Sequence, residues 1–259
     1  MKEESIKIEI EDKNEEVSLD ETADNETADK NNENDVKEDK NMVKENKTVV
    51  NNFNDEKLIN VGVEDEEMDL FFILDRSGSM YGTESDTING FNAFIEKQLA
   101  QNHNILVTTI LFDSKYEVLY SRKPISEVKP LTEKEYYVRG STALLDAIGR
   151  TVSQNQRKVN HAMCVITTDG YENASREFNR DQIKDMVENS GWEFVFIGAD
   201  IDSYGEASRI GIRKSRVARH RKNSRGIHDM YNAVNKMTTN FYRTRDINDD
   251  NEEWKKDLE

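Results

Sequence analysis

The segment Asp75-Arg76-Ser77-Gly78-Ser79 carries an oxygen-bearing side chain at every second position, directly after an apolar run. In a loop at the carboxyl edge of a parallel sheet, this spacing aims three oxygens at one point, where open α/β sheets also bind ligands. One carboxylate and two neutral hydroxyls suit a hard cation such as Mg²⁺ or Mn²⁺. They suit zinc less well, because zinc usually takes His or Cys ligands. We expect Arg76, between these positions, at the rim of the metal face.

Two further loops supply one oxygen ligand each. Thr142 lies just before a helical pattern that begins at Leu144, and Asp169 is followed by Gly170 at the end of a long strand pattern. A serine-rich turn capping a helix would explain either serine of the first motif singly, but not the three loops together. The predicted metal ligands are therefore Asp75, Ser77, Ser79, Thr142 and Asp169.

In spacing, order and strand context, these motifs resemble the metal-ion-dependent adhesion site of von Willebrand factor A domains. The resemblance covers roughly residues 66–242 and includes the run Ala-Leu-Leu-Asp-Ala-Ile at 143–148 and the Gly-x-x-Asn pattern at 170–173. It is greatest for the small intracellular members of that family from bacteria and phages.

The resemblance implies a role for each ligand. Ser77, Ser79 and Thr142 would bind the metal directly, whereas Asp75 and Asp169 would act directly or through water, depending on state. Because such an inner shell is mostly neutral, the metal keeps an electrophilic open position that a partner's Glu or Asp can fill. The expected function is thus divalent-metal-dependent protein binding, with Mg²⁺ or Mn²⁺ favoured over Ca²⁺ and with loops 76–85, 139–142 and 170–178 giving specificity.

Enzyme signatures are incomplete. A phosphatase of the haloacid dehalogenase type needs a second Asp two residues after the first, where this chain has Ser77. There is no Gly-x-x-x-x-Gly-Lys-Ser/Thr loop, and the four histidines form neither a zinc motif nor a nucleophile elbow. We therefore expect a protein that is not an enzyme. A Mg²⁺-dependent hydrolase is kept as an alternative, since an open Mg²⁺ site can activate water.

Apolar runs predict the strands that position these loops, at 70–74, 105–112, 162–168 and 192–198. Helical spacings lie between and after them, at 88–99, 144–152, 183–187 and 226–242. Alternating strands and helices predict an α/β fold, a doubly wound and mostly parallel sheet of about six strands with helices on both faces. Residues 116–120 follow the second strand too closely for a crossover, so they predict an antiparallel hairpin. Val217 is placed on a short edge strand.

The N-terminal region differs sharply in composition from the rest. The chain has 259 residues with 36 Lys+Arg and 52 Asp+Glu, a net charge of -16. Residues 1–60 contribute 19 acidic and 9 basic side chains (net -10), which leaves 33 against 27 (net -6) for residues 61–259. We predict a disordered acidic region at 1–62, a von Willebrand factor A-type domain at 63–245 and a charged end at 246–259, where Trp254 can dock.

The expected location is the cytoplasm, without membrane contact and as a monomeric domain. No apolar run approaches the ~18–20 residues of a membrane span, and acidic residues follow Met1 where a signal peptide would be apolar. The single Cys164 cannot form an internal disulfide, and its apolar neighbours predict that it is a buried apolar residue.

A basic segment at 209–225 supports a second binding hypothesis. Its cationic side chains are Arg209, Arg213, Lys214, Arg216, Arg219, Arg221, Lys222 and Arg225. They could bind nucleic acid or an acidic partner, which would make the chain a nucleic-acid-associated accessory protein. The segment lacks interleaved aromatic residues, and a pI near 4.8 disfavours nucleic acid as the main partner. The simpler interpretation is a solvated loop.

Overall fold

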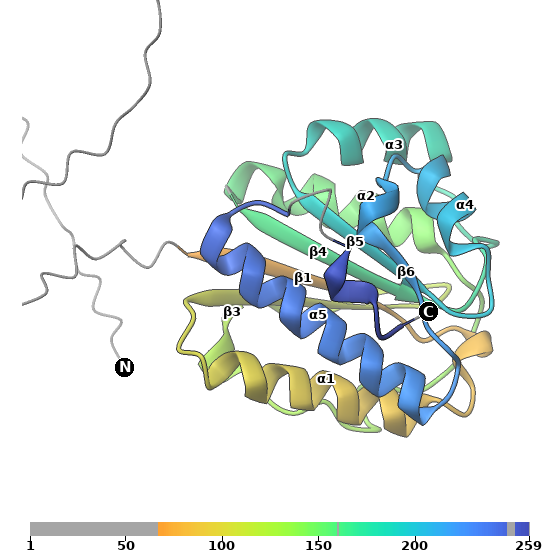
Figure 1. Cartoon of the computed structure of the whole chain (residues 1–259). Coiled ribbons are helices and arrows are strands. Elements are labelled where there is room, and N and C mark those ends of the chain that lie inside the picture. The colour runs from red at the N-terminus through yellow and green to blue at the C-terminus, as the bar shows by residue number, and fades with distance from the viewer. Residues whose placement is uncertain (1–66, 160, 248–251, 259) are drawn as a thin grey trace, which may run out of the picture. The chain divides into compact units, whose positions relative to one another are not determined.

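A computed structural model describes residues 67–159, 161–247 and 252–258, so the region 1–62 lies outside the described residues. Six strands form one sheet in the order β3-β2-β1-β4-β5-β6 (Figure 1). Their bounds are β1 Met68–Asp75, β2 Ile105–Phe112, β3 Tyr116–Pro124, β4 Ala162–Thr168, β5 Glu193–Gly198 and β6 Val217–Arg219. Every neighbouring pair is parallel except β2 and β3, which form the predicted antiparallel hairpin. The mostly parallel α/β sheet is confirmed.

Helices cover both faces of the sheet. Their bounds are α1 Glu84–Leu99, α2 Leu144–Asn155, α3 Arg180–Asn189, α4 Ser203–Arg209 and α5 Ser224–Thr244. The yellow α1 and blue α5 pack together on one face, and α2, α3 and α4 cover the other (Figure 1). The sequence did not predict α4, because a seven-residue helix is too short for a clear 3.6-residue period. Its start is set by Asp202, whose side chain accepts a hydrogen bond from Gly205 N.

Strand β1 explains why the core has two halves. All eight of its residues are buried. Leu70 and Phe72 pack in the layer of α1 and α5, while Phe71 and Ile73 pack in the layer of α2, α3 and α4. Successive side chains of a strand point to opposite faces, so a strand covered on both sides must be apolar throughout. The continuous apolar run that the sequence shows at β1 reflects this burial on both faces.

The C-terminal segment 252–258 also packs on the domain. Trp254 is only 7% exposed, and its indole N–H donates to Ser215 O at 3.2 Å, so it docks as expected. Leu258 is buried in the layer that contains α5. Across the residues described, no helix is both long and apolar enough to cross a membrane.

The strand order places a topological switch point at β1. The chain runs outward from β1 through β2 to β3, then returns to β4 on the other side of β1. Ligands of open α/β sheets bind where the strand order reverses in this way, beyond the carboxyl ends of the strands. The loops after β1 and β4 both open at this position.

A candidate metal centre at the carboxyl edge of the sheet

Three hydroxyl oxygens meet at the carboxyl end of β1. Ser77 Oγ lies 3.0 Å from Ser79 Oγ, and Thr142 Oγ1 donates a hydrogen bond to Ser77 Oγ at 2.9 Å. Ser77 and Thr142 are buried, whereas Ser79 is exposed. Oxygens from two loops that are 65 residues apart in sequence therefore form one cluster, open to solvent on the Ser79 side.

Asp75 holds the two central strand ends together. Its Oδ1 accepts from Ser77 N at 2.6 Å, and its Oδ2 accepts from the Thr168 hydroxyl at the end of β4, also at 2.6 Å. Burial raises the pKa of Asp75 to about 6, although these hydrogen bonds favour the charged form. Since both carboxylate oxygens are already engaged, Asp75 is positioned to support the cluster from behind.

Asp169 lacks such anchors. Its side chain is 2% exposed, and no hydroxyl or backbone N–H of the described residues donates to it; its close partner is an ammonium, that of Lys222, 2.8 Å from Oδ2. A buried carboxylate is stable only beside a compensating charge or donor. The next residue, Gly170, lies directly against the hydroxyl cluster, because a Cβ there would lie 2.7 Å from Thr142 Oγ1 and 3.0 Å from Ser79 Oγ. A buried carboxylate that takes a cationic partner, next to a cluster of hydroxyl oxygens, is a donor set that suits a metal ion.

Backbone hydrogen bonds tie the three loops to one another. Gly78 N donates to Gly140 O at 3.0 Å, which joins the β1 loop to the loop before α2. Thr142 N donates to Asn173 Oδ1 at 2.9 Å, and Asn173 N returns a bond to Thr142 O at 3.0 Å. The Asn of the Gly-x-x-Asn pattern thereby fixes the position of Thr142.

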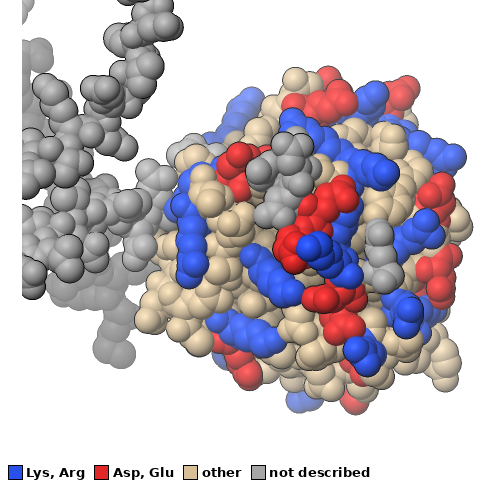
Figure 2. All heavy atoms as spheres, in the orientation of Figure 1, with Lys and Arg blue, Asp and Glu red and all other residues tan. Residues whose placement is uncertain are grey.

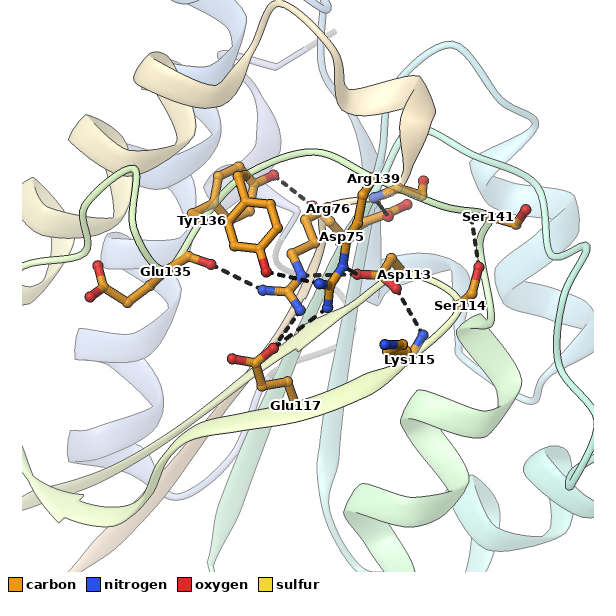
Figure 3. Close-up of polar contacts among 12 residues, drawn as sticks. Asp75, Arg76, Asp113, Ser114, Lys115, Glu117, Glu135, Tyr136, Arg139 and Ser141 are labelled. Carbon is orange, nitrogen blue, oxygen red and sulfur yellow. Dashed lines mark hydrogen bonds and ion pairs between the residues drawn. The ribbon is translucent and has the colours of Figure 1, made fainter.

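Arg76 does not lie at the rim of the metal face, so this expectation was wrong. Its side chain is fully buried behind the β1 loop, where it donates to Asp113 at 3.0 Å and to Glu117 at 2.6 Å (Figure 3). Arg139 donates to the same Asp113 carboxylate at 2.8 Å, and Tyr136 donates its hydroxyl proton to Asp75 O at 2.6 Å. This network attaches the metal loops to the β2–β3 hairpin. A sequence gives little warning of it, because an Arg in a loop is usually exposed.

A lysine from the basic segment reaches the centre. The ammonium of Lys222, between β6 and α5, lies 2.8 Å from Asp169 Oδ2 and donates to Ser79 O at 2.5 Å. Sequence reasoning counted Lys222 only as one charge among eight. It also overlooked the Thr168 hydroxyl, although its place at a strand end beside Asp169 was visible.

The basic segment does not form one continuous charged surface. Arg216 is 2% exposed and donates to Glu193, Arg209 pairs with Glu206, and Arg225 approaches Asp229. On the face shown in Figure 2, positive and negative side chains interleave over α5 and the C-terminal segment. This dispersal does not favour nucleic-acid binding.

Three exposed tyrosines belong to the loops at the centre or adjoin them. Tyr81, Tyr137 and Tyr171 are 80%, 42% and 51% exposed, and each lies in or beside one of the loops expected to give specificity. In the described part of the chain, no group of three or more His, Cys, Asp or Glu side chains could hold a metal ion, at this centre or elsewhere. The candidate site therefore depends on the hydroxyls of Ser77, Ser79 and Thr142.

The sheet order and the position of this centre define a von Willebrand factor A-like fold. No protein-family model and no curated protein matches the sequence. Among solved structures, proximal thread matrix protein 1 from the mussel byssus has a TM-score of 0.50 at 17% identity, covering 66% of this chain and 46% of that one. A second structure of that protein, described as having a zinc-occupied MIDAS (metal-ion-dependent adhesion site) motif, has a TM-score of 0.50 at 16% identity with the same coverage.

A bacterial protein shares the fold as well. The D319A mutant of the PilB minor pilin from Streptococcus sanguinis has a TM-score of 0.53 at 12% identity, covering 70% of this chain and 64% of that one. This chain thus spans less than half of the mussel protein and under two thirds of the pilin. At these identities the comparisons establish the fold.

Proposed function

We propose that this chain is a divalent-metal-dependent protein-binding module and not an enzyme. The observation that carries the proposal is the cluster of Ser77, Ser79 and Thr142 hydroxyls beside the buried carboxylate of Asp169. The three hydroxyls would hold the metal directly. Asp169 would supply negative charge beside it, and Asp75 would keep the loops in register from behind.

The chemistry of the donor set favours a hard cation. The cluster offers hydroxyl oxygens that are hydrogen-bonded to one another at 3.0 Å and 2.9 Å, with carboxylates beside them. Mg²⁺ and Mn²⁺ prefer such oxygen ligands and are the first candidates. Zn²⁺ belongs in the same test, because the mussel neighbour is described with zinc in its MIDAS motif.

When bound, the metal would supply an electrophilic position for a carboxylate of a protein partner. The chain's own surface is suited to the remainder of such an interface. Tyr81, Tyr137 and Tyr171 are exposed around the centre, and exposed tyrosines are frequent hot spots of protein interfaces. The partner would thus offer one Glu or Asp to the centre and further surface to these tyrosines.

The test has two stages, of which the first measures metal binding alone. Mg²⁺, Mn²⁺ and Zn²⁺ are titrated calorimetrically into the full chain, into the double variant Ser77→Ala with Thr142→Ala, and into Ser153→Ala as a control on the exposed face of α2. We expect binding to the wild type and the control only. Equal binding to the double variant would refute the site.

The second stage tests the carboxylate. Random peptides displayed on phage are captured on the protein with Mg²⁺ or Mn²⁺ and eluted with EDTA. Eluted sequences should share a Glu or Asp, and its replacement by Gln or Asn should abolish capture. Capture that survives EDTA, or that needs no acidic residue, would contradict the proposed mode. Metal-dependent turnover of generic phosphoesters would instead support the hydrolase alternative.

A further inference from the structure

Lys222 is the one basic-segment residue with a described contact to the candidate metal centre. Its side chain leaves the loop between β6 and α5 and places the ammonium 2.8 Å from Asp169 Oδ2 and 2.5 Å from Ser79 O. The side chain is 26% exposed, against 2% for Asp169. A partly solvated cation is therefore in contact with a buried anion.

Asp169 requires a positive charge at this position. Apart from the Lys222 ammonium, no described residue donates to its carboxylate oxygens, and its burial removes the stabilisation that water would give. Lys222 supplies that charge as the counter-ion of Asp169. A metal bound at the hydroxyl cluster would be a second and stronger one.

We infer that Lys222 is a built-in cation that competes with the metal for Asp169, and the inference rests on the metal-binding function proposed above. Ser79 touches both cations: its hydroxyl belongs to the cluster, and its carbonyl accepts from Lys222. A divalent ion beside Ser79 would repel an ammonium in contact with the same residue and the same carboxylate. Metal entry displaces Lys222, and Lys222 weakens metal binding.

The loop permits this exchange without moving its backbone. His220 N donates to Gly198 O at 3.0 Å, and the Asn223 side chain caps α5 by accepting from Gly226 N at 2.8 Å. Both ends of the short loop are thereby fixed. The four-carbon stem of Lys222 has rotatable bonds that can turn its ammonium toward solvent, and the side chain is already 26% exposed.

The test compares Lys222→Met with Lys214→Met in the full chain. Both variants lose one positive charge of the same segment, but Lys214 is exposed and has no described contact with Asp169 or Ser79. Calorimetric titration of Mg²⁺ and Mn²⁺ should show about tenfold tighter binding to Lys222→Met and little change for Lys214→Met. Lys222→Met should also melt at a lower temperature without metal and gain more from adding it.

Each outcome decides a separate claim. Equal or weaker metal binding by Lys222→Met than by the wild type overturns the competition, because Lys222 would then be neutral or helpful to the metal. No metal binding by any of the proteins overturns the proposed function itself. Lys222→Arg keeps the charge and protects the test against misfolding of the Met variant. It should bind metal about as the wild type does, and tenfold tighter binding by it would also overturn the competition.

Discussion

Replacing Gly170 by Ala should weaken metal binding while leaving the fold intact. A Cβ at this position would lie 2.7 Å from Thr142 Oγ1, 3.0 Å from Ser79 Oγ and 3.6 Å from Ser77 Oγ. Carbon–oxygen contacts are usually 3.3–3.6 Å, so the Thr142 hydroxyl would have to retreat by about 0.6 Å. Without a metal, the hydroxyls can turn away from the methyl group. A bound metal would hold the hydroxyls in place, so the methyl group would clash with them only when the metal is bound.

The magnitude follows from the cost of overpacking. Inserting one methyl group into a filled site costs about 1–3 kcal/mol, which corresponds to about 5- to 150-fold weaker metal binding. Calorimetric titration of Mn²⁺ into Gly170→Ala measures this loss, and urea unfolding without metal measures stability. Gly170→Ala should change the free energy of unfolding by less than it changes the free energy of metal binding.

Gly191→Ala is the matched control. Gly191 has φ +75°, no atom lies within 4 Å of its added Cβ, and it precedes β5 at the opposite edge of the sheet. Its Ala variant should therefore lose stability through backbone strain, by about 1 kcal/mol, and keep its metal affinity. Wild-type affinity in Gly170→Ala would refute the placement of the metal among these hydroxyls.

Three further predictions concern the surroundings of the centre. Arg76→Met should lower the free energy of unfolding by about 3–5 kcal/mol in urea melts, because it leaves the buried Asp113 with less compensation. The exposed Arg225→Met should stay within about 0.5 kcal/mol, and a similar loss in both would contradict the role of burial. Cys164 is buried in β4, and burial raises the pKa of its thiol. A disulfide reagent should therefore label it only after unfolding. Rapid labelling of the native protein would show that β4 opens. Metal affinity should fall as pH drops below about 6, because burial raises the pKa of Asp75 to that value. A metal affinity that stays constant from pH 7 to 5 would contradict this prediction.

The Asp75 prediction has an opposite sign for stability. Its folded pKa of about 6 lies above the ordinary aspartate value of 3.8, so the folded chain without metal binds the extra proton. Lowering the pH through this window therefore adds stability from this group while it removes metal affinity. Thermal melts with and without metal between pH 7 and 5 separate the two effects.

The sequence by itself predicted the strands, because the apolar runs indicate which strands are buried on two faces. The alternation of Asp75, Ser77 and Ser79 is a spacing within one loop, and the family resemblance added Thr142 and Asp169 from two other loops to the candidate ligands. Strand ends in a parallel sheet share an edge, so these loops were expected to lie close together. The hydroxyl distances agree with that assignment.

Only the tertiary structure shows which cationic side chains contact the candidate metal centre. Lys222 lies 143 residues from the Ser79 carbonyl it contacts, and Arg76, adjacent to the ligands in sequence, turns away into a buried ion network. A long, flexible side chain can reach any partner within its radius, so its contacts depend on how loops pack. A short Ser or Thr hydroxyl stays within about 2.5 Å of its own backbone, and the backbone position follows from the strand pattern. For this reason the candidate ligands could be predicted from the sequence, whereas the contact of Lys222 with Asp169 could not.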